Sequence, residues 1–357
     1  MNTLSQKFWS AKVHELSPYV PGEQPKLQNL VKLNTNENPF PPSPKVYEAM
    51  QNTLNASLRL YPDPSSTQLR KSMAKFYSLD TEQVFVGNGS DEVLAHTFQA
   101  LLKQDAPLLF PDISYSFYPV YCGLYGIEHR QVPLAQDLTI QIEDYQQENG
   151  GVILPNPNAP TGQLLSLDAI RKLLTNNARR VVVIDEAYID FGGQSATALV
   201  PEFDNLLVVQ TLSKSRSLAG LRVGFAFGQR HLIEALERVK NSFNSYPLSI
   251  ESQAGAMAAI EDVDYFQKTC QANIAQREEL AAKLKSLGFS MTKSHANFLF
   301  VTHKVMAAKD IALALREQGI IVRHLTNNPR ITNYLRISVG SQDECAQLVT
   351  ALESILV

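Results

Sequence analysis

The sequence predicts an α/β protein: a large domain with a mostly parallel sheet covered by helices, followed by a small α+β domain. The first observation is a series of short apolar runs at 84–86, 107–110, 151–154, 180–184, 206–209 and 223–227. These runs are continuously apolar, as strands buried on both faces are, and the helical stretches between them indicate βαβ crossovers. The second observation is a change of rhythm beyond Pro247.

The chain beyond Pro247 predicts the small domain. Long helical patterns span about 248–287, with a break near Asp262, and 305–318. They alternate with strand-like runs at 296–301, 320–322 and 335–338. This mixture predicts a compact α+β domain with a small sheet. At 357 residues the chain is also longer than one hydrophobic core usually serves, which favours two domains.

The first forty residues are rich in proline and polar groups, and they end in Asn34-Thr-Asn-Glu-Asn-Pro-Phe-Pro-Pro-Ser-Pro44. This composition predicts an extended arm that lies across other elements. We therefore expect three parts: an N-terminal arm at 1–34 that forms part of the small domain, a large domain at 35–246 and a small C-terminal domain at 247–357.

Composition and charge exclude several classes of protein. With 44% hydrophobic and 19% charged residues, the chain is typical of a soluble globular protein. Its net charge of −3 gives no basic footprint, so we expect no nucleic-acid partner. No run approaches the ~18 apolar residues of a membrane span, and the first ten residues lack the apolar core of a signal peptide. We therefore expect no membrane association.

The three cysteines, Cys122, Cys270 and Cys345, are odd in number and far apart. This pattern fits neither a disulfide framework nor a clustered metal site, so we expect no metal. The cysteines are more typical of buried residues in a reducing compartment, and we expect a cytoplasmic protein.

Two charged residues follow neighbouring strands of the predicted sheet. Asp185 comes directly after the run 181–184, at the carboxyl end of a strand, where open α/β sheets bind ligands. The run 206–209 delivers Lys214 to the same edge. Asp185 is either a cap of the next turn or a buried acid that meets a cation. Lys214 is either its salt-bridge partner or an amine that forms a Schiff base with a carbonyl cofactor.

Two further segments lie at carboxyl ends of predicted strands. Gly87-Asn-Gly-Ser-Asp-Glu92 precedes a helical pattern, so its amides and the positive end of that helix suit a phosphate, although Ser90 or Asp91 can instead be simple N-caps. The segment is not G-x-G-x-x-G, which argues against a dinucleotide-binding dehydrogenase. Asn156-Pro-Asn-Ala-Pro-Thr-Gly162 predicts a rigid turn whose amides can reach a ligand.

In order and spacing, these segments resemble the fold-type I pyridoxal-phosphate enzymes of the aminotransferase class. The resemblance covers nearly the whole chain through the segments 34–40, 59–64, 87–92, 156–162, 185–188, 211–214 with 219–222, and 335–340. It implies a large domain with a mostly parallel seven-stranded sheet, a small α+β domain, and pyridoxal 5'-phosphate as cofactor.

The resemblance assigns catalytic roles to three residues. Lys214 would form the Schiff base with the cofactor and carry the α-proton of the substrate. Asp185 would pair with the ring nitrogen and keep it protonated, so that the ring acts as an electron sink. Tyr188 would bond the ring hydroxyl.

The resemblance also implies a set of residues that hold the cofactor. Tyr115 would stack on the ring, and an asparagine of the turn would bond the ring hydroxyl. Relatives often carry asparagine directly before Pro-Thr-Gly, where this chain has Ala159, so the contact is assigned to Asn158. The phosphate would be held by the amides of Gly89, Ser90 and Asp91, by the Ser213 hydroxyl and by Arg222.

For the substrate, the family aligns Arg336 with an arginine that grips an anionic group, although a solvated strand arginine is the simpler reading. Members that act on histidinol phosphate resemble this chain further at 17–19, 245–249 and 320–323. Tyr19, Tyr246 and Arg323 would then line the phosphate end. The implied reaction converts histidinol phosphate and 2-oxoglutarate to imidazole-acetol phosphate and glutamate, or the reverse, in histidine biosynthesis. An aromatic amino-acid aminotransferase and a decarboxylase of a phosphorylated amino acid remain alternatives.

The segment Arg59-Leu-Tyr-Pro-Asp-Pro64 bears on the oligomeric state. The resemblance implies that Tyr61 reaches the cofactor phosphate of a neighbouring subunit. The active sites would then be shared in a homodimer with twofold symmetry, with the proline-rich arm crossing the interface.

Overall fold

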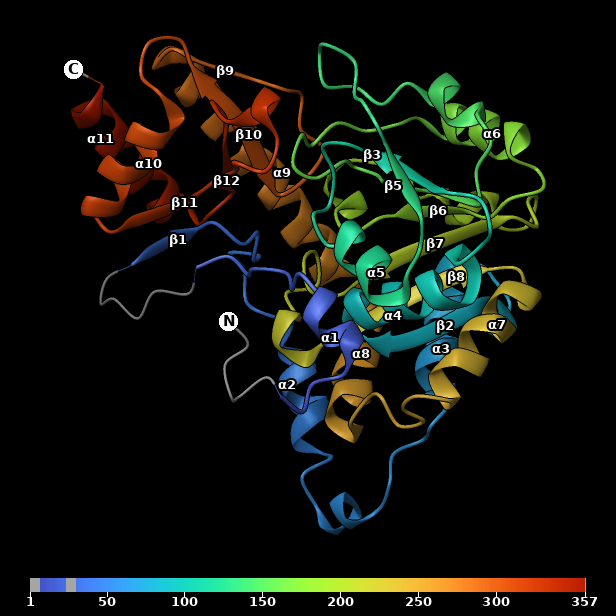
Figure 1. Ribbon diagram of the computed structural model, residues 1–357. Coiled ribbons are helices and arrows are strands. Elements are labelled where there is room, and N and C mark those ends of the chain that lie inside the picture. The colour runs from blue at the N-terminus through green and yellow to red at the C-terminus, as the bar shows by residue number, and fades with distance from the viewer. Residues whose placement is uncertain (1–6, 24–29, 357) are drawn as a thin grey trace.

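Two β-sheets organise the computed structural model, which describes residues 7–23 and 30–356 (Figure 1). Within these residues the larger sheet has seven strands in the order β2-β8-β7-β6-β5-β3-β4, and the smaller sheet has five in the order β1-β11-β12-β10-β9. Residues 1–6 and 24–29 of the predicted arm lie outside the described residues.

The large sheet confirms the predicted α/β fold. Its strands are β2 (Val84–Asn88), β3 (Leu108–Pro111), β4 (His129–Val132), β5 (Gly151–Pro155), β6 (Val182–Asp185), β7 (Leu206–Thr211) and β8 (Val223–Gly228). All neighbours are parallel except that β8 runs antiparallel to both β2 and β7. Sequence patterns missed β4 because this edge strand buries only Val132 and shows no apolar run.

Both faces of the large sheet are covered, which explains the continuously apolar strands. In β6, Val182 and Ile184 pack into one core and Val183 packs into the other. The first core includes α3 (Thr67–Tyr77), α6 (Leu167–Asn176) and α8 (Ile250–Glu261), and the second includes α4 (Gly89–Thr97), α5 (Tyr118–Tyr125) and α7 (Arg230–Asn241). A strand between two such layers has no face toward solvent, so its sequence does not alternate apolar and polar residues.

The small sheet confirms the predicted α+β domain. Its strands are β1 (Val31–Leu33), β9 (Phe289–Met291), β10 (Phe298–His303), β11 (Ile320–His324) and β12 (Leu335–Ser338), and its helices are α9 (Val263–Ser286), α10 (Ala308–Glu317) and α11 (Gln342–Ile355). β1 pairs in parallel with β11, as Figure 1 shows. The end of the predicted arm is therefore a strand of this sheet.

The remaining elements are short or join the two sheets. They are α1 (Ala11–Glu15), α2 (Pro44–Gln51), a π-helical turn at Phe98–Leu102, and 3₁₀ turns at Ala56–Arg59, Thr81–Gln83, Ile142–Gln146, Ile189–Phe191, Ala196–Leu199, Ala219–Leu221 and Pro329–Ile331. None of the described helices has the length and apolarity that a membrane crossing requires.

The division into 1–34, 35–246 and 247–357 remains a proposal. Val46 of α2 and Ala256, Ala259 and Ile260 of α8 belong to a core of the large sheet. The helical break predicted near Asp262 is present, since α8 ends at Glu261 and α9 begins at Val263. Core membership thus favours a second boundary at this break rather than at 246.

Candidate active site

A cavity of about 550 Å³ lies at the carboxyl edge of the large sheet. The end of β11 and the residues after it contribute 323–327, and β12 contributes Arg336. The N-terminal region contributes 18–22 and 34–36. The cavity therefore draws on both sheets and on the predicted arm. Eleven predicted site residues line it: Tyr19, Ser90, Asp91, Tyr115, Asp185, Tyr188, Ser213, Lys214, Arg222, Arg323 and Arg336.

Strand direction explains this convergence. β5, β6 and β7 are parallel, so their carboxyl ends share one edge. β8 is antiparallel to both β7 and β2, so its first residues and the carboxyl end of β2 reach the same edge. Asp185 at the end of β6, Lys214 beyond β7, and Arg222 before β8 are thereby brought to one place.

Asp185 is a buried carboxylate with one free oxygen. Its Oδ2 atom accepts a hydrogen bond from Tyr118 Oη at 2.8 Å, whereas Oδ1 is buried without a partner among the described residues. Burial raises the pKa of Asp185 to about 6, against the opposing effect of the Tyr118 hydrogen bond. An unpartnered buried carboxylate oxygen at the cavity wall fits the protonated ring nitrogen of pyridoxal phosphate.

The start of α4 forms an anion cradle. Ser90 and Asp91 lie in its first turn, where backbone amides and the helix dipole favour a phosphate. Arg222 Nη2 lies 3.0 Å from Asp91 Oδ2. A Cβ atom on Gly89, whose φ is +76°, would lie 2.5 Å from Arg222 Nη2, and one on Gly224 would lie 2.4 Å from the Ser90 nitrogen. The two glycines thus let Arg222 and β8 approach the helix start.

A hydroxyl group just after β7 completes the cradle. Thr211 Oγ1, at the end of β7, donates to Ser213 Oγ at 2.9 Å, and both residues line the cavity. The Ser213 hydroxyl keeps its own hydrogen, so with Arg222 and the α4 amides it provides donors that a phosphate requires. Gly89 itself does not line the cavity, so its contribution is to admit Arg222.

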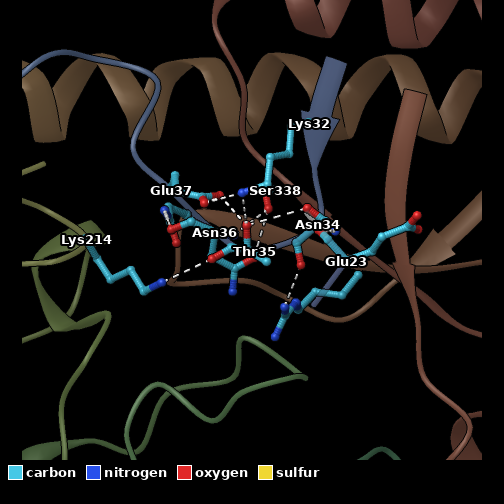
Figure 2. Close-up of polar contacts among 10 residues, drawn as sticks. Glu23, Lys32, Asn34, Thr35, Asn36, Glu37, Lys214 and Ser338 are labelled. Carbon is cyan, nitrogen blue, oxygen red and sulfur yellow. Dashed lines mark hydrogen bonds and ion pairs between the residues drawn. The ribbon is translucent and has the colours of Figure 1, made fainter. Parts of the chain in front are cut away.

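Lys214 is held by the segment that follows β1. Its Nζ atom donates to the Thr35 carbonyl at 3.1 Å, as Figure 2 shows, and Asn38 Nδ2 donates to the Lys214 carbonyl at 2.9 Å. The ion pairs of the described residues do not include Lys214, which disfavours the salt-bridge alternative. A partly buried amine without a counter-charge suits covalent chemistry.

Two tyrosines flank the cavity. Tyr188 accepts a hydrogen bond from Asn36 Nδ2 at 3.0 Å and packs edge-on against Phe298 at 5.1 Å between ring centroids. Tyr115 Oη donates to Asp91 Oδ1 at 2.9 Å, and burial raises the pKa of Tyr115. The Tyr115 phenol is therefore a neutral hydroxyl at the cavity wall. Ring stacking on Tyr115 stays a prediction.

Asn158 does not reach the cavity. It is buried, and its Nδ2 atom donates to the Ile113 carbonyl at 3.0 Å and to Thr161 Oγ1 at 3.1 Å. The cavity wall of this turn is formed by Pro155, Pro157, Ala159 and Pro160. Because its amide hydrogens are committed behind this wall, the structure does not support the predicted contact of Asn158 with a ring hydroxyl.

Tyr61 and Tyr246 also lie outside the cavity of their own chain. Their rings stack at 4.6 Å between centroids, and Tyr61 is 81% exposed. Tyr246 therefore does not line the cavity of its own chain, and its assignment to the phosphate end stays a prediction. Both side chains face outward instead.

Arg323 and Arg336 form a dicationic corner. They stand opposite each other on the antiparallel pair β11 and β12. Arg336 Nη2 donates to the Asn34 carbonyl at 3.0 Å, and its Nε atom is buried without a partner among the described residues. Burial lowers the pKa of Arg336, and the charge of Arg323 adds to this. Neither arginine takes part in an ion pair within the described chain, so the corner is suited to an anionic ligand.

Sequence reasoning missed several residues of the site. Tyr118, which holds Asp185, and Thr35 and Asn36, which hold Lys214 and Tyr188, had no predicted role. Asn36 falls within the matched segment 34–40, and this was the only available signal. Tyr19 was predicted, but its tilted contact with the Phe117 ring, at 4.8 Å between centroids, was not. Such contacts join residues far apart in sequence, and no local pattern marks them.

Comparisons with known proteins agree with this geometry. The family model of aminotransferase class I and II matches residues 28–352. The histidinol-phosphate aminotransferase 1 of Hydrogenovibrio crunogenus is 62% identical over 350 residues, which cover 98% of each chain. The histidinol-phosphate aminotransferase of Acinetobacter baylyi is 58% identical over 358 residues, or 99% of each chain.

Solved structures support the fold. The histidinol-phosphate aminotransferase of Sinorhizobium meliloti, in complex with pyridoxal-5'-phosphate, superposes with a TM-score of 0.83 at 22% identity and covers 91% of this chain and 90% of that one. A Thermus thermophilus aspartate aminotransferase mutant gives a TM-score of 0.82 at 20% identity, with 98% and 99% coverage.

The environment of Asp185 predicts a pH-dependent stability of the cofactor-free protein. Because the folded-state pKa, about 6, lies above the usual 3.8, its contribution to stability is present below pH ~4 and is lost as the pH rises through about 6. Asp185→Asn should remove this loss, so its free energy of unfolding should exceed that of the wild type by up to ~3 kcal/mol at pH 8.

Urea unfolding between pH 4 and pH 8 measures this difference. The exposed Asp204→Asn variant is the control and should follow the wild-type curve. A constant difference between Asp185→Asn and the wild type across this range would show that the carboxyl is not titrating in the cavity.

Proposed function

Because the chain belongs to the aminotransferase class I and II family, we propose that it interconverts histidinol phosphate and 2-oxoglutarate with imidazole-acetol phosphate and glutamate, in histidine biosynthesis. It is a transferase that uses pyridoxal 5'-phosphate. The observation that carries the substrate assignment is the presence of two separate cationic sites in one cavity, at Arg222 and at Arg323 with Arg336. One suits the phosphate of the cofactor and the other suits the anion of the substrate.

The cofactor supplies a carbonyl carbon that binds amines and a ring that takes up electron density from the substrate α-carbon. The chain would hold its phosphate with the α4 amides, Ser213 and Arg222. Asp185 Oδ1 would accept the hydrogen of the ring nitrogen and keep that nitrogen protonated. A buried carboxylate has no competing water, so this interaction would be stronger than in solution.

Lys214 would carry protons during the reaction. Its Nζ atom is partly buried at the cavity wall and donates a hydrogen bond to the Thr35 carbonyl. From there, the amine would take the proton of the substrate α-carbon and return it to the carbonyl carbon of the cofactor, as a general base and then a general acid. Removal of this one side chain would therefore abolish both the attachment of the cofactor and the proton transfer.

Arg323 and Arg336 would bind both substrates in turn. Histidinol phosphate presents a phosphate and glutamate presents carboxylates, and a guanidinium group bonds either in a bidentate manner. The segment 18–22 also lines the cavity and brings Tyr19 near this end. The arginine corner thus meets the requirement that a transaminase accept two different substrates in one pocket.

The same proposal includes a homodimer with shared active sites. Several large apolar side chains are exposed, and such side chains together mark an interaction surface. They are Leu58, Leu60, Tyr61, Phe243 and Tyr246. Tyr61 points away from its own cavity, in agreement with a role at the cofactor phosphate of a second copy. A second copy related by twofold symmetry would cover these residues.

We also propose that the enzyme works in the cytoplasm. Cys122, Cys270 and Cys345 are free and buried in the structure. Burial raises the pKa of each thiol, so the thiols are unreactive. Free thiols are usual in a reducing compartment.

Lys214→Ala should lose the covalent bond to the cofactor and nearly all turnover while it remains folded. Borohydride reduction of the loaded wild type, followed by peptide mapping, should place the label on Lys214 and on no residue of the variant. Lys283→Ala, an exposed lysine paired with Glu279, is the matched control and should retain label and turnover. A label on another side chain contradicts the assignment.

Arg323→Ala should lower kcat/KM for histidinol phosphate by about 10- to 100-fold, because it removes a charged hydrogen-bonding group worth roughly 1.5–3 kcal/mol. The half-reaction with phenylalanine should change less, because phenylalanine presents a single carboxylate and no phosphate to the two arginines. Cofactor spectra in single turnovers measure both. Arg316→Ala, whose side chain pairs with Glu23 at the surface, is the control. Faster conversion by phenylalanine than by histidinol phosphate in the wild type would favour an aromatic aminotransferase.

Subunit mixing tests the shared site. Tyr61→Ala should weaken cofactor binding, and Lys214→Ala should be inactive. In a mixed dimer, one site combines an intact Lys214 with the Tyr61 of the other subunit. Mixing the two variants should therefore give more activity than the two variants give separately. Light scattering confirms the dimer. A fully active monomer, or no recovery in proven heterodimers, contradicts this arrangement.

A further inference from the structure

Asn36 is a buried polar residue at the cavity wall to which the reaction above gives no role. It lies between β1 and α2, is 1% exposed and has a φ of +56°. Its Nδ2 atom donates to Tyr188 Oη at 3.0 Å. Asparagine adopts this left-handed conformation more readily than most residues other than glycine.

Ser338 of β12 and Asn297, which directly precedes β10, hold Asn36 through three hydrogen bonds. The backbone nitrogen of Asn36 donates to Ser338 Oγ at 2.9 Å, and Ser338 Oγ donates to Asn36 Oδ1 at 2.9 Å, as Figure 2 shows. Asn297 Nδ2 donates to the Asn36 carbonyl at 2.9 Å. All three residues are buried. Asn36 is thus fixed at its backbone and at its side-chain oxygen.

These bonds fix the direction of the Asn36 amide. A backbone N–H can only donate, so Ser338 Oγ is the acceptor of that bond and its own hydrogen is free for Asn36 Oδ1. With Oδ1 engaged in this way, the NH₂ group is the part of the amide that faces Tyr188. Tyr188 Oη is therefore an acceptor toward Asn36.

A phenol that accepts from Asn36 keeps its own hydrogen for another partner. Tyr188 lines the cavity, so this hydrogen is available to an acceptor in the cavity. The neighbouring turn offers no side-chain donor there, since residues 155–160 present three prolines and the methyl group of Ala159. The Asn158 amide is turned away toward Ile113 and Thr161. Tyr188 is then the donor on this wall.

We propose that Asn36 is a positioning residue that orients the Tyr188 hydroxyl hydrogen into the cavity, toward the ring oxygen of the cofactor. The inference rests on the proposed placement of the cofactor ring beside Tyr188. Asn36 touches neither the cofactor nor the substrate in this arrangement. It acts because its NH₂ group donates to Tyr188 Oη. A carboxylate of the same size at this position could only accept, and it would draw the Tyr188 hydrogen away from the cavity.

Three variants separate this role from a structural one. Asn36→Gly removes the side chain and tolerates the positive φ. Asn36→Asp keeps the size and the bonds to Ser338 but can only accept from Tyr188. Tyr188→Phe removes the hydroxyl group itself. The readouts are the dissociation constant of pyridoxal phosphate from the cofactor-free protein, the pH midpoint of the absorption change of the bound cofactor, and the melting temperature.

Asn36→Gly should weaken cofactor binding by about fivefold, because a net hydrogen bond contributes about 1 kcal/mol. Its pH midpoint should rise by about half a unit, since loss of a donor disfavours the deprotonated form of the cofactor. Asn36→Asp should weaken binding more, to the level of Tyr188→Phe. In the Tyr188→Phe background neither substitution should add a further effect.

Three results overturn the proposal. The first is wild-type affinity and pH midpoint in Asn36→Gly, with or without a lower melting temperature. The second is tighter binding by Asn36→Asp than by Asn36→Gly. The third is an Asn36 effect that persists in full when Tyr188 is phenylalanine, which would show that Asn36 or the new charge acts directly. Failure of the proposed function appears differently, as absence of cofactor binding in the wild type.

Discussion

The rest of the site depends on the buried carboxylate of Asp185. One oxygen is held by Tyr118 and the other is left without a partner at the cavity wall. A fully buried, half-satisfied acid costs stability, and its raised pKa is a measure of that cost. Above the raised pKa, a cationic group that enters the cavity offsets this cost. The central strand β6 is rigid enough to keep the oxygen there, because parallel neighbours bond it on both sides.

The segment 34–38 is the second constraint, since it joins the two sheets at the reacting groups. The Thr35 carbonyl holds Lys214, which follows a strand of the large sheet, and the Asn34 carbonyl holds Arg336 of the small sheet. Asn36 bonds both Ser338 and Tyr188. The amine, the ring-oxygen donor and the anion-binding arginine therefore share one short piece of backbone. A shift of the small sheet on substrate binding would be felt at all three groups.

Sequence patterns could predict the elements whose residues carry the signal themselves. The buried strands, the break near Asp262, and the edge that collects Asp185 and Lys214 follow from apolar runs and strand direction. They could not predict β1, whose three residues become a strand only by pairing with β11. Nor could they place Asn158, because a turn motif does not reveal which amide faces the cavity and which bonds the loop behind it. The hydrogen bond between Asn36 and Tyr188 joins residues 152 positions apart, so no local sequence pattern indicates it.

The opposed arginines show why substrate binding and stability compete in this cavity. Arg323 and Arg336 face each other across β11 and β12, and burial together with mutual repulsion lowers the pKa of Arg336. Without an anion, the protein bears two like charges at neighbouring positions, which destabilises the strand pair. A phosphate or carboxylate that bonds both groups removes this repulsion, so part of its binding energy is relief of strain already present in the chain. A neutral aromatic side chain relieves nothing, and the corner therefore discriminates by charge before it discriminates by shape.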